Sequence, residues 1–166
     1  MALNRDLNFS IILDNIRSVE NIGAIFRTAD VLGIAKIYLA GVSGITYSGQ
    51  EKILHPKVEK TALGAQNFIP WEHWENIGEL IDNLKSQNIK IVCLENNVPN
   101  AKNILEFEPQ FPLALIAGNE VEGINAQILE KSDAIIQIPM FGQKESLNVA
   151  TAAGIAGFEI NKHRII

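Results

Sequence analysis

Hydrophobic positions along the chain follow two patterns that alternate from one end to the other. Short apolar runs rich in β-branched residues predict buried strands, and longer segments with apolar residues every three or four positions predict amphipathic helices. This alternation predicts an α/β fold with a mainly parallel sheet flanked by helices. The expected strands are 9–13, 36–40, 68–70, 89–94, 113–117 and 134–138, and the expected helices are 21–32, 56–64, 74–86, 125–131 and the segment from 147 onward. The glycine-containing segment 41–54 is expected to be a loop.

Two of the expected helices indicate clearly which face is buried. In the first, apolar residues at positions i, i+3, i+4 and i+7 form a core stripe of Ile22, Ile25, Phe26 and Ala29. In the third, the inner face is formed by Ile77, Leu80, Ile81 and Leu84. Both helices are therefore expected to pack against the sheet.

The stretch from the last expected strand into the last helix is the most informative part of the chain. Pro139 ends the strand because proline has no N–H for a sheet ladder. A polar loop, 142–146, follows, and Ser146 is expected to cap the helix. One face of that helix carries only small residues, namely Ala150, Ala153, Gly154 and Gly157. Each glycine costs about 1 kcal/mol relative to alanine in a helix, so this row predicts close packing against another backbone.

Length and composition predict one folded domain covering residues 1–166. The chain is 47% hydrophobic and 20% charged, as is ordinary for a globular protein. The N-terminus does not resemble a signal peptide, and no apolar run reaches the ~18 residues of a membrane span. We therefore expect a cytoplasmic protein without a membrane partner.

The net charge of −5 is distributed unevenly along the chain. Residues 1–66 contain seven Lys or Arg and six Asp or Glu, whereas residues 67–166 contain seven and thirteen. A polyanionic partner is therefore expected to contact the N-terminal portion.

The familiar signatures of metal and nucleophilic sites are not found in the sequence. His55, His73 and His163 are widely separated, and none has a second ligand three or four positions away. Cys93 lies inside an apolar run, which favours a buried strand thiol over a nucleophile. The sequence contains no P-loop and no nucleophile elbow.

The first expected helix carries a candidate ligand-binding residue, Arg27. On helical spacing it shares a face with Gly23 and Ala24, whose small side chains leave the guanidinium free to reach a ligand. The alternative is an exposed arginine that pairs with Asp30, three positions on. Asn21, at the start of the helix, is by default an N-cap.

Two loops at expected strand ends are further candidates. The turn 118–123 follows strand 113–117, the position at which open α/β sheets bind ligands, but it does not match the dinucleotide-binding G-x-G-x-x-G motif. An ordinary strand-to-helix turn remains the alternative. The loop 139–148 also emerges at a strand end, and exposed backbone groups on two such loops are suited to hold a flat heterocycle.

Four segments together resemble the SpoU (TrmH-like) branch of the SPOUT methyltransferases, in order and spacing over nearly the whole chain. They are Asn21-Ile-Gly-Ala-Ile-Phe-Arg-Thr-Ala, His55-Pro-Lys-Val-Glu-Lys-Thr-Ala-Leu-Gly-Ala, Ala117-Gly-Asn-Glu-Val-Glu-Gly-Ile and Ile138-Pro-Met-Phe-Gly-Gln-Lys-Glu-Ser-Leu-Asn-Val-Ala. Phe26 and Asn119 depart mildly from the family pattern.

The resemblance implies a C-terminal deep trefoil knot that holds S-adenosylmethionine, without a metal. Pattern alone would have predicted an unknotted sheet, since knots are nearly absent from proteins. The positions that the resemblance implies for cofactor binding are Leu94, Glu95, Gly118, Ile138, Met140 and Leu147.

The reaction implied by the resemblance is methyl transfer to the 2′-hydroxyl of a ribose in RNA. Arg27 would hold a phosphate and stabilise the developing alkoxide, because an arginine is a poor base. Asn21 would orient Arg27 or the ribose, and Glu120 would anchor the site. Ser146 and Asn148 would shape the knot loop and contact the substrate.

Alternatives remain for the substrate and for the assembly. Other SPOUT branches methylate bases, and a non-catalytic RNA- or cofactor-binding module is a further possibility. The chain shows no added RNA-binding segment such as many relatives carry, which favours tRNA over rRNA. We also expect a homodimer in which the small-residue row of one chain meets helix 21–32 of the other and brings Arg27 to the partner's cofactor loops; packing of the row within its own chain is the alternative.

Overall fold

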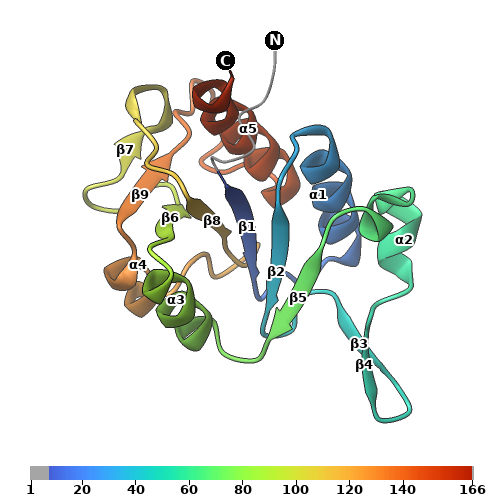
Figure 1. The fold of residues 1–166 in the computed structure, drawn as a ribbon. Helices are drawn as coiled ribbons and strands as arrows, with labels where there is room; N and C mark the ends of the chain where they lie inside the picture. The colour runs from blue at the N-terminus through green and yellow to red at the C-terminus, as the bar shows by residue number, and fades with distance from the viewer. Residues whose placement is uncertain (1–7, 166) are drawn as a thin grey trace.

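The computed structural model describes residues 8–165, which form a seven-stranded sheet and a separate two-stranded hairpin (Figure 1). The strand order is β5-β2-β1-β8-β6-β9-β7, and all neighbouring strands of this sheet are parallel. The strands are β1 Phe9–Asp14, β2 Lys36–Ala40, β3 Ile45–Ser48, β4 Glu51–Leu54, β5 Trp71–Trp74, β6 Lys90–Leu94, β7 Lys102–Asn103, β8 Leu113–Ala117 and β9 Ala134–Gln137. The prediction of a mainly parallel α/β sheet is confirmed.

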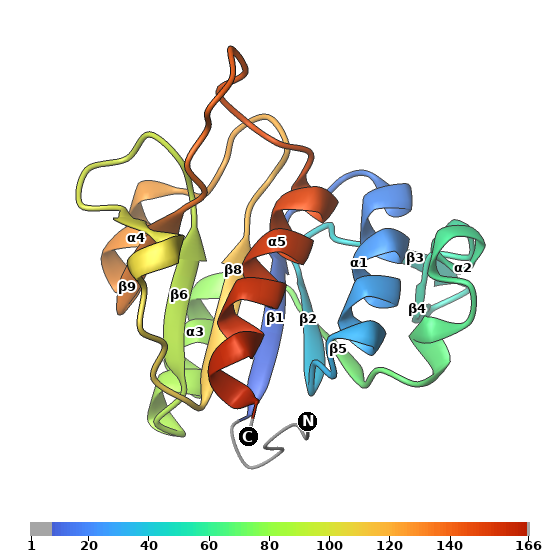
Figure 2. The same cartoon turned by 90° about the horizontal axis from the view of Figure 1, so that it is seen from above.

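Helices cover both faces of the sheet. The α-helices are α1 Val19–Val31, α2 Lys57–Ala62, α3 Ile77–Ser86, α4 Ala126–Lys131 and α5 Val149–Asn161, and short 3₁₀ helices span Ala65–Asn67, Ile104–Glu106 and Lys162–Arg164. Helices α1 and α5 lie on one face with α2 beside α1, and α3 and α4 lie on the other (Figure 2). None of the helices within residues 8–165 is both long and apolar enough to cross a membrane.

The two faces bury separate cores because successive strand residues point to opposite sides. In β8, Leu113 and Leu115 pack into the core under α1 and α5, whereas Ile116 packs into the core under α3 and α4. The stripe predicted for α1 is buried, and Leu80, Ile81 and Leu84 of α3 are buried as predicted.

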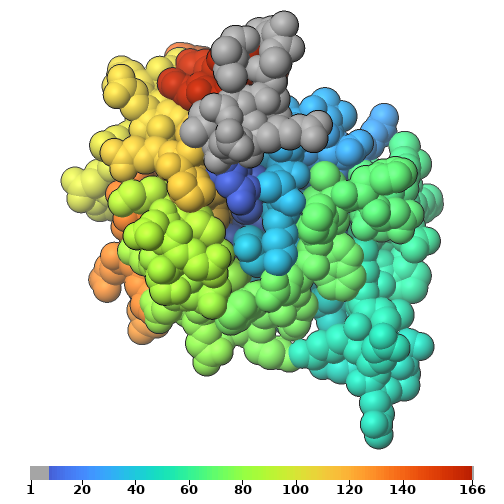
Figure 3. Space-filling model, viewed as in Figure 1, coloured from blue at the N-terminus to red at the C-terminus, as the bar shows by residue number. Residues whose placement is uncertain are grey.

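Three predicted segments differ from the structure. The expected loop 41–54 contains the hairpin β3–β4, which projects from the body (Figure 3). Gly49, at the first position of its two-residue turn, has the positive φ of 64° that such turns favour in glycine. The expected strand 68–70 is wrong: the chain joins the sheet at Pro70, whose carbonyl accepts from Ile37 N–H, and β5 follows. Helix α3 begins three residues later than predicted, because the Asn76 side chain caps it.

The caps predicted for α1 and α5 are also wrong. Ser18, not Asn21, caps α1 and accepts from Asn21 N–H at 3.1 Å. Asn148, not Ser146, caps α5 and accepts from Ala150 N–H at 2.9 Å. The reason is the same in both helices: the hydroxyl or amide that caps must immediately precede the first helical turn. The side chain of Asn148 is therefore a helix cap, whereas the side chain of Asn21 is not.

Two glycines of the small-residue row of α5 pack against α1 of the same chain, which is the alternative stated for the row; its packing against a second chain stays a prediction. A Cβ added at Gly157 would lie 2.8 Å from Leu32 Cδ1, and one at Gly154 would lie 3.5 Å from Thr28 Cγ2, both on α1. The space beside Gly23 is likewise filled, because a Cβ there would lie 2.0 Å from Thr61 Oγ1 in α2. These glycines permit close helix contacts inside one protomer, while Ala150 and Gly154 of the row remain half-buried.

Candidate functional site

A cavity of about 330 Å³, the cofactor-sized cavity, lies at the carboxyl ends of β6, β8 and β9. Its walls come from the three connections that follow these strands and from the start of α5. The structure gathers there nine of the residues proposed from the sequence: Leu94, Glu95, Gly118, Glu120, Ile138, Met140, Ser146, Leu147 and Asn148. Segments up to 54 positions apart in the chain therefore form one site, because parallel strands end at the same edge.

The wall after β6 is fixed to the wall after β9 by a paired amide contact. Asn96 Nδ2 donates to the Ile138 carbonyl at 3.1 Å, and Ile138 N–H donates to Asn96 Oδ1 at 3.2 Å. Glu95 adds a second link, since its carboxylate accepts from Asn96 N–H and from Ile124 N–H. Glu95 therefore holds the walls together, and Asn96 is a site residue that the sequence analysis missed.

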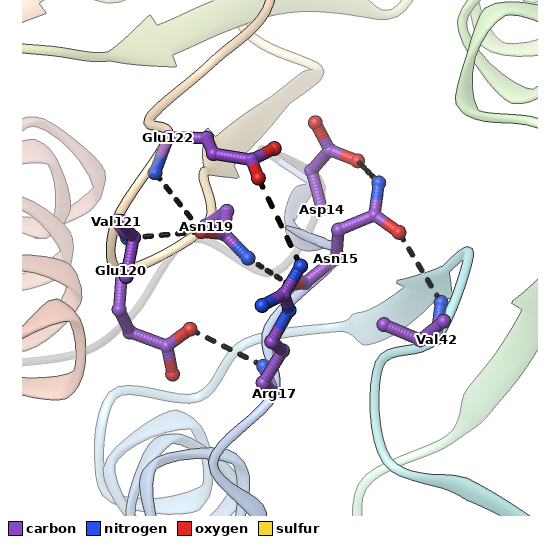
Figure 4. A network of polar contacts seen from close by, with 8 residues as sticks. All are labelled: Asp14, Asn15, Arg17, Val42, Asn119, Glu120, Val121 and Glu122. Carbon is purple, nitrogen blue, oxygen red and sulfur yellow. Dashed lines mark hydrogen bonds and ion pairs between the residues drawn. The ribbon is translucent and has the colours of Figure 1, made fainter.

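Gly118 allows the turn after β8 to fold back on itself. A Cβ added there would lie 2.5 Å from Ile124 Cγ1 and 2.9 Å from the Gly123 carbonyl carbon. Asn119 stabilises the same turn: its Oδ1 accepts from Val121 N–H and Glu122 N–H, and its Nδ2 donates to the Asn15 carbonyl at 2.7 Å (Figure 4). The departure from the family pattern at this position is thus accommodated by a local hydrogen-bonded turn.

Glu120 connects this turn to the start of α1. Its carboxylate accepts from Arg17 N–H and Ser18 N–H, each at 3.2 Å, and from Asn21 Nδ2 at 3.1 Å. The contact with the Arg17 backbone is visible in Figure 4. Partial burial raises the pKa of Glu120, but the hydrogen bonds from Asn21 and from backbone N–H groups outweigh it, and the net pKa lies below the ordinary value. Glu120 is therefore held as a carboxylate.

Asn21 joins the two ends of the site. Its Nδ2 donates to Glu120, and its Oδ1 accepts from Asn148 Nδ2 at 3.0 Å. Because Asn148 also caps α5, the Glu120–Asn21–Asn148 chain links the turn after β8, helix α1 and helix α5. These three residues, proposed separately from three segments, form one hydrogen-bonded network.

Arg27 does not line the cofactor-sized cavity. It lies exposed on α1 beside a second, shallower cavity of about 600 Å³, which is also lined by Ala24, Thr28, Val31, Leu32, Lys60, Thr61 and Leu63. The ion pairs between side chains of residues 8–165 do not include one with Asp30, so the expected alternative for Arg27 is not observed. Its guanidinium is available to a ligand or a partner.

The remaining candidates have structural roles or are dispersed. Cys93 is buried in β6 as predicted, and burial raises the pKa of its thiol to about 12. Within the described part of the chain, no three His, Cys, Asp or Glu side chains gather as a metal site would require. The absence of a metal requirement stays a prediction.

A parallel α/β sheet with a ligand-sized cavity at the carboxyl ends of neighbouring strands is the class of fold that binds nucleotides and related cofactors at that edge. Within this class the chain belongs to the SpoU rRNA Methylase family, whose model matches residues 8–158. The family resemblance predicted from the sequence is confirmed.

Individual relatives agree with this assignment. The 23S rRNA (guanosine(2553)-2′-O)-methyltransferase RlmP of Bacillus subtilis is 32% identical over 152 residues, 90% of this chain and 56% of that protein. The A. aeolicus TrmH/SpoU tRNA modifying enzyme superimposes with a TM-score of 0.81 at 28% identity over 98% of this chain and 78% of its own. The SpoU methyltransferase AviRb from Streptomyces viridochromogenes, in complex with AdoMet, gives 0.82 at 25% identity over 99% of this chain and 59% of its own. The chain thus spans less than two thirds of the length of the curated relative.

Proposed function

We propose that the protein transfers a methyl group from S-adenosylmethionine to the 2′-hydroxyl of a ribose in RNA. The observation that carries this proposal is the connection of the cofactor-sized cavity, through Glu120, Asn21 and Asn148, to the helix that presents Arg27. The relatives support it, since RlmP is named for 2′-O-methylation of RNA and AviRb is described with AdoMet bound.

The cavity suits the proposed cofactor in size and chemistry. Its volume of about 330 Å³ is at the lower end of the range for small-molecule sites. Ile138, Met140 and Leu147 would bound a flat adenine ring, while backbone groups after β6 and at Gly118 would bind its polar edge. When bound, the cofactor supplies an electrophilic methyl group on a positively charged sulfur.

The transfer requires a polarised oxygen in line with that methyl group. The ribose oxygen forms a bond to the methyl carbon, the carbon–sulfur bond breaks, and the hydroxyl proton leaves to water, giving 2′-O-methyl RNA and S-adenosylhomocysteine. Arg27 would hold the adjacent phosphate and stabilise the developing alkoxide, because its guanidinium remains protonated. Asn21 and Asn148 would position the ribose, and Ser146, at the cavity edge, would contact the substrate.

We propose further that two copies of the chain share each site. Arg27 is exposed outside the cofactor cavity, and large apolar side chains surround its helix. Val31 of α1 is 80% exposed and Phe158 of α5 is 70% exposed. Their sequence neighbours, Leu32 and Gly157, pack against each other where α1 meets α5. A second protomer on this surface would bury these apolar groups and bring its cofactor cavity to Arg27.

Two structural expectations belong to the same proposal. The connection 138–148 between β9 and α5 would pass through the segment after β6 as a deep trefoil knot, and residues 1–166 would form one methyltransferase domain. The contacts between Asn96 and Ile138, which join these two segments, support such an arrangement. A cytoplasmic location, with RNA as the partner, remains a prediction.

The direct test is transfer of labelled methyl groups to RNA from cells that lack the protein. Separated tRNA and rRNA are both offered, because the relatives are named for both; tRNA is the predicted acceptor. The product bond should resist alkaline cleavage, since the 2′-hydroxyl is blocked. Label that remains on alkali-sensitive RNA would indicate base methylation. No transfer together with cofactor binding would indicate a binding module.

A further inference from the structure

Two exposed apolar side chains belong to the loops that form the cofactor-sized cavity, and the mechanism above uses neither. Phe141 is 93% exposed and lies in the loop between β9 and α5. Val121 is 86% exposed and lines the cavity from the turn after β8. Large apolar groups exposed on the loops that form a functional cavity indicate a binding surface.

The loop that carries Phe141 projects from the molecule on the side of the cavity. Figure 2 shows the connection between β9 and α5 extending beyond the strand ends, beside the connection between β8 and α4. The neighbouring Met140 and, further along, Ser146 line the cavity, whereas Phe141 does not. Phe141 is therefore exposed next to a residue of the cavity wall but lies outside the cavity itself.

The charge of this loop gives it no net attraction for phosphate. Lys144 and Glu145 are adjacent, exposed and of opposite sign, so the segment 139–148 has no net charge. What the loop offers is an aromatic face. Unpaired RNA bases are bound in this way, by stacking on aromatic side chains at a free-energy gain that is largely independent of sequence.

We propose that Phe141 stacks on the base of the nucleotide whose ribose is methylated, with Val121 bounding the same base from the opposite loop. This inference rests on the proposed function and names the part of the substrate that this surface binds. A base held here would leave its ribose at the cavity edge, near Asn148 and Ser146. The target nucleotide would then have to be unpaired, because a paired base has no free face.

The test compares Phe141→Ala and Phe141→Trp with the matched control Phe68→Ala. Phe68 is 75% exposed and precedes β5, at the other end of the sheet from β9. We expect Phe141→Ala to raise the KM for the methyl-accepting RNA fraction about tenfold or more, and Phe141→Trp to stay near wild type. Affinity for S-adenosylmethionine should change less than about twofold, and Phe68→Ala should match wild type in both measurements.

A second arm uses RNA in which the mapped target nucleotide is abasic. Wild-type protein should lose as much affinity for this RNA as Phe141→Ala loses for the intact RNA, and the two changes combined should cost no more than either alone. Equal KM values for Phe141→Ala and Phe68→Ala would overturn the inference, and so would a loss of cofactor affinity in Phe141→Ala, which would assign the ring to the adenine. Failure of the wild-type protein to methylate either RNA fraction would instead overturn the proposed function.

Discussion

The cofactor-sized cavity and the surface around Arg27 are built in opposite ways. The cavity is enclosed by three connections of one chain, and its walls are fixed by hydrogen bonds that involve Glu95 and Asn96. The surface around Arg27 is open and bordered by exposed apolar side chains. Under the proposed function, one chain would suffice to bind the cofactor, whereas transfer would need a second surface to meet Arg27.

The largest effect is expected from Arg27→Ala. Loss of the guanidinium should reduce methyl transfer by about 10²–10³-fold, the usual effect of removing a group that stabilises developing charge. Cofactor affinity, measured by calorimetry, should remain near wild type because Arg27 lies outside the cavity. Arg27→Lys should fail as well, since an ammonium does not reproduce the planar fork. A lysine variant with wild-type activity would favour generic charge over geometry.

The converse change is Leu147→Trp. An indole at this partly exposed position would occupy cavity volume, and we expect cofactor affinity to fall by at least about tenfold, since such sites bury most of their ligand. Val31→Ala serves as the control, because Val31 lines only the other surface. Unchanged calorimetric affinity in Leu147→Trp would mean that the cofactor binds elsewhere.

Gly23→Ala tests the close packing of α1 against α2 on the face of α1 that carries Arg27. The added methyl group would lie 2.0 Å from Thr61 Oγ1 and 2.4 Å from the Val58 carbonyl oxygen, so α1 and α2 must move apart. We expect a loss of about 1–3 kcal/mol in the free energy of unfolding, measured with denaturant. In Gly142→Ala, where nothing lies within 4 Å of the added Cβ, the change should be near zero. Equal stabilities of the two variants would contradict the close packing at Gly23.

The smallest effect concerns the connection between the regions. The pKa of Glu120 is lowered in the folded protein, so its contribution to stability is present above the ordinary carboxylate pKa and is lost as the pH falls through the folded value. Wild type should therefore melt above Glu120→Gln at pH 7, and the difference should shrink below about pH 4.5. A difference in melting temperature that is independent of pH would show that charge at Glu120 is unimportant.

The parts of the fold that sequence patterns predicted well are those buried on both faces. Strand β8 is matched to the residue because Leu113–Ala117 is uniformly apolar between Pro112 and Gly118. Strand β5 was misplaced because its residues are only half-buried and include Glu72 and His73, so no apolar period marks it. The hairpin β3–β4, short and largely polar, was missed for the same reason.

The site shows a similar division. Its cofactor-binding and polar residues were predicted through the family resemblance, which rests on sequence segments and carries no information on contacts between them. The contacts themselves, such as Arg17 N–H to Glu120 across 103 positions, leave no local pattern in the sequence. The contacts of Gly154 and Gly157 with α1 could not be assigned to one chain from the sequence, because a row of small residues indicates a close neighbour without indicating which chain supplies it.

The most direct test of the shared site mixes two inactive variants. Arg27→Ala chains retain the cofactor cavity, and Leu147→Trp chains retain Arg27, so a mixed dimer would contain one intact site. With equal amounts and full subunit exchange, followed with two affinity tags, we predict recovery of about a quarter of wild-type methyl transfer, because half of the dimers are mixed and each has one working site of two. A mixture that stays inactive despite demonstrated exchange, or a wild-type protein that sediments as a monomer at the assay concentration, would contradict the shared site.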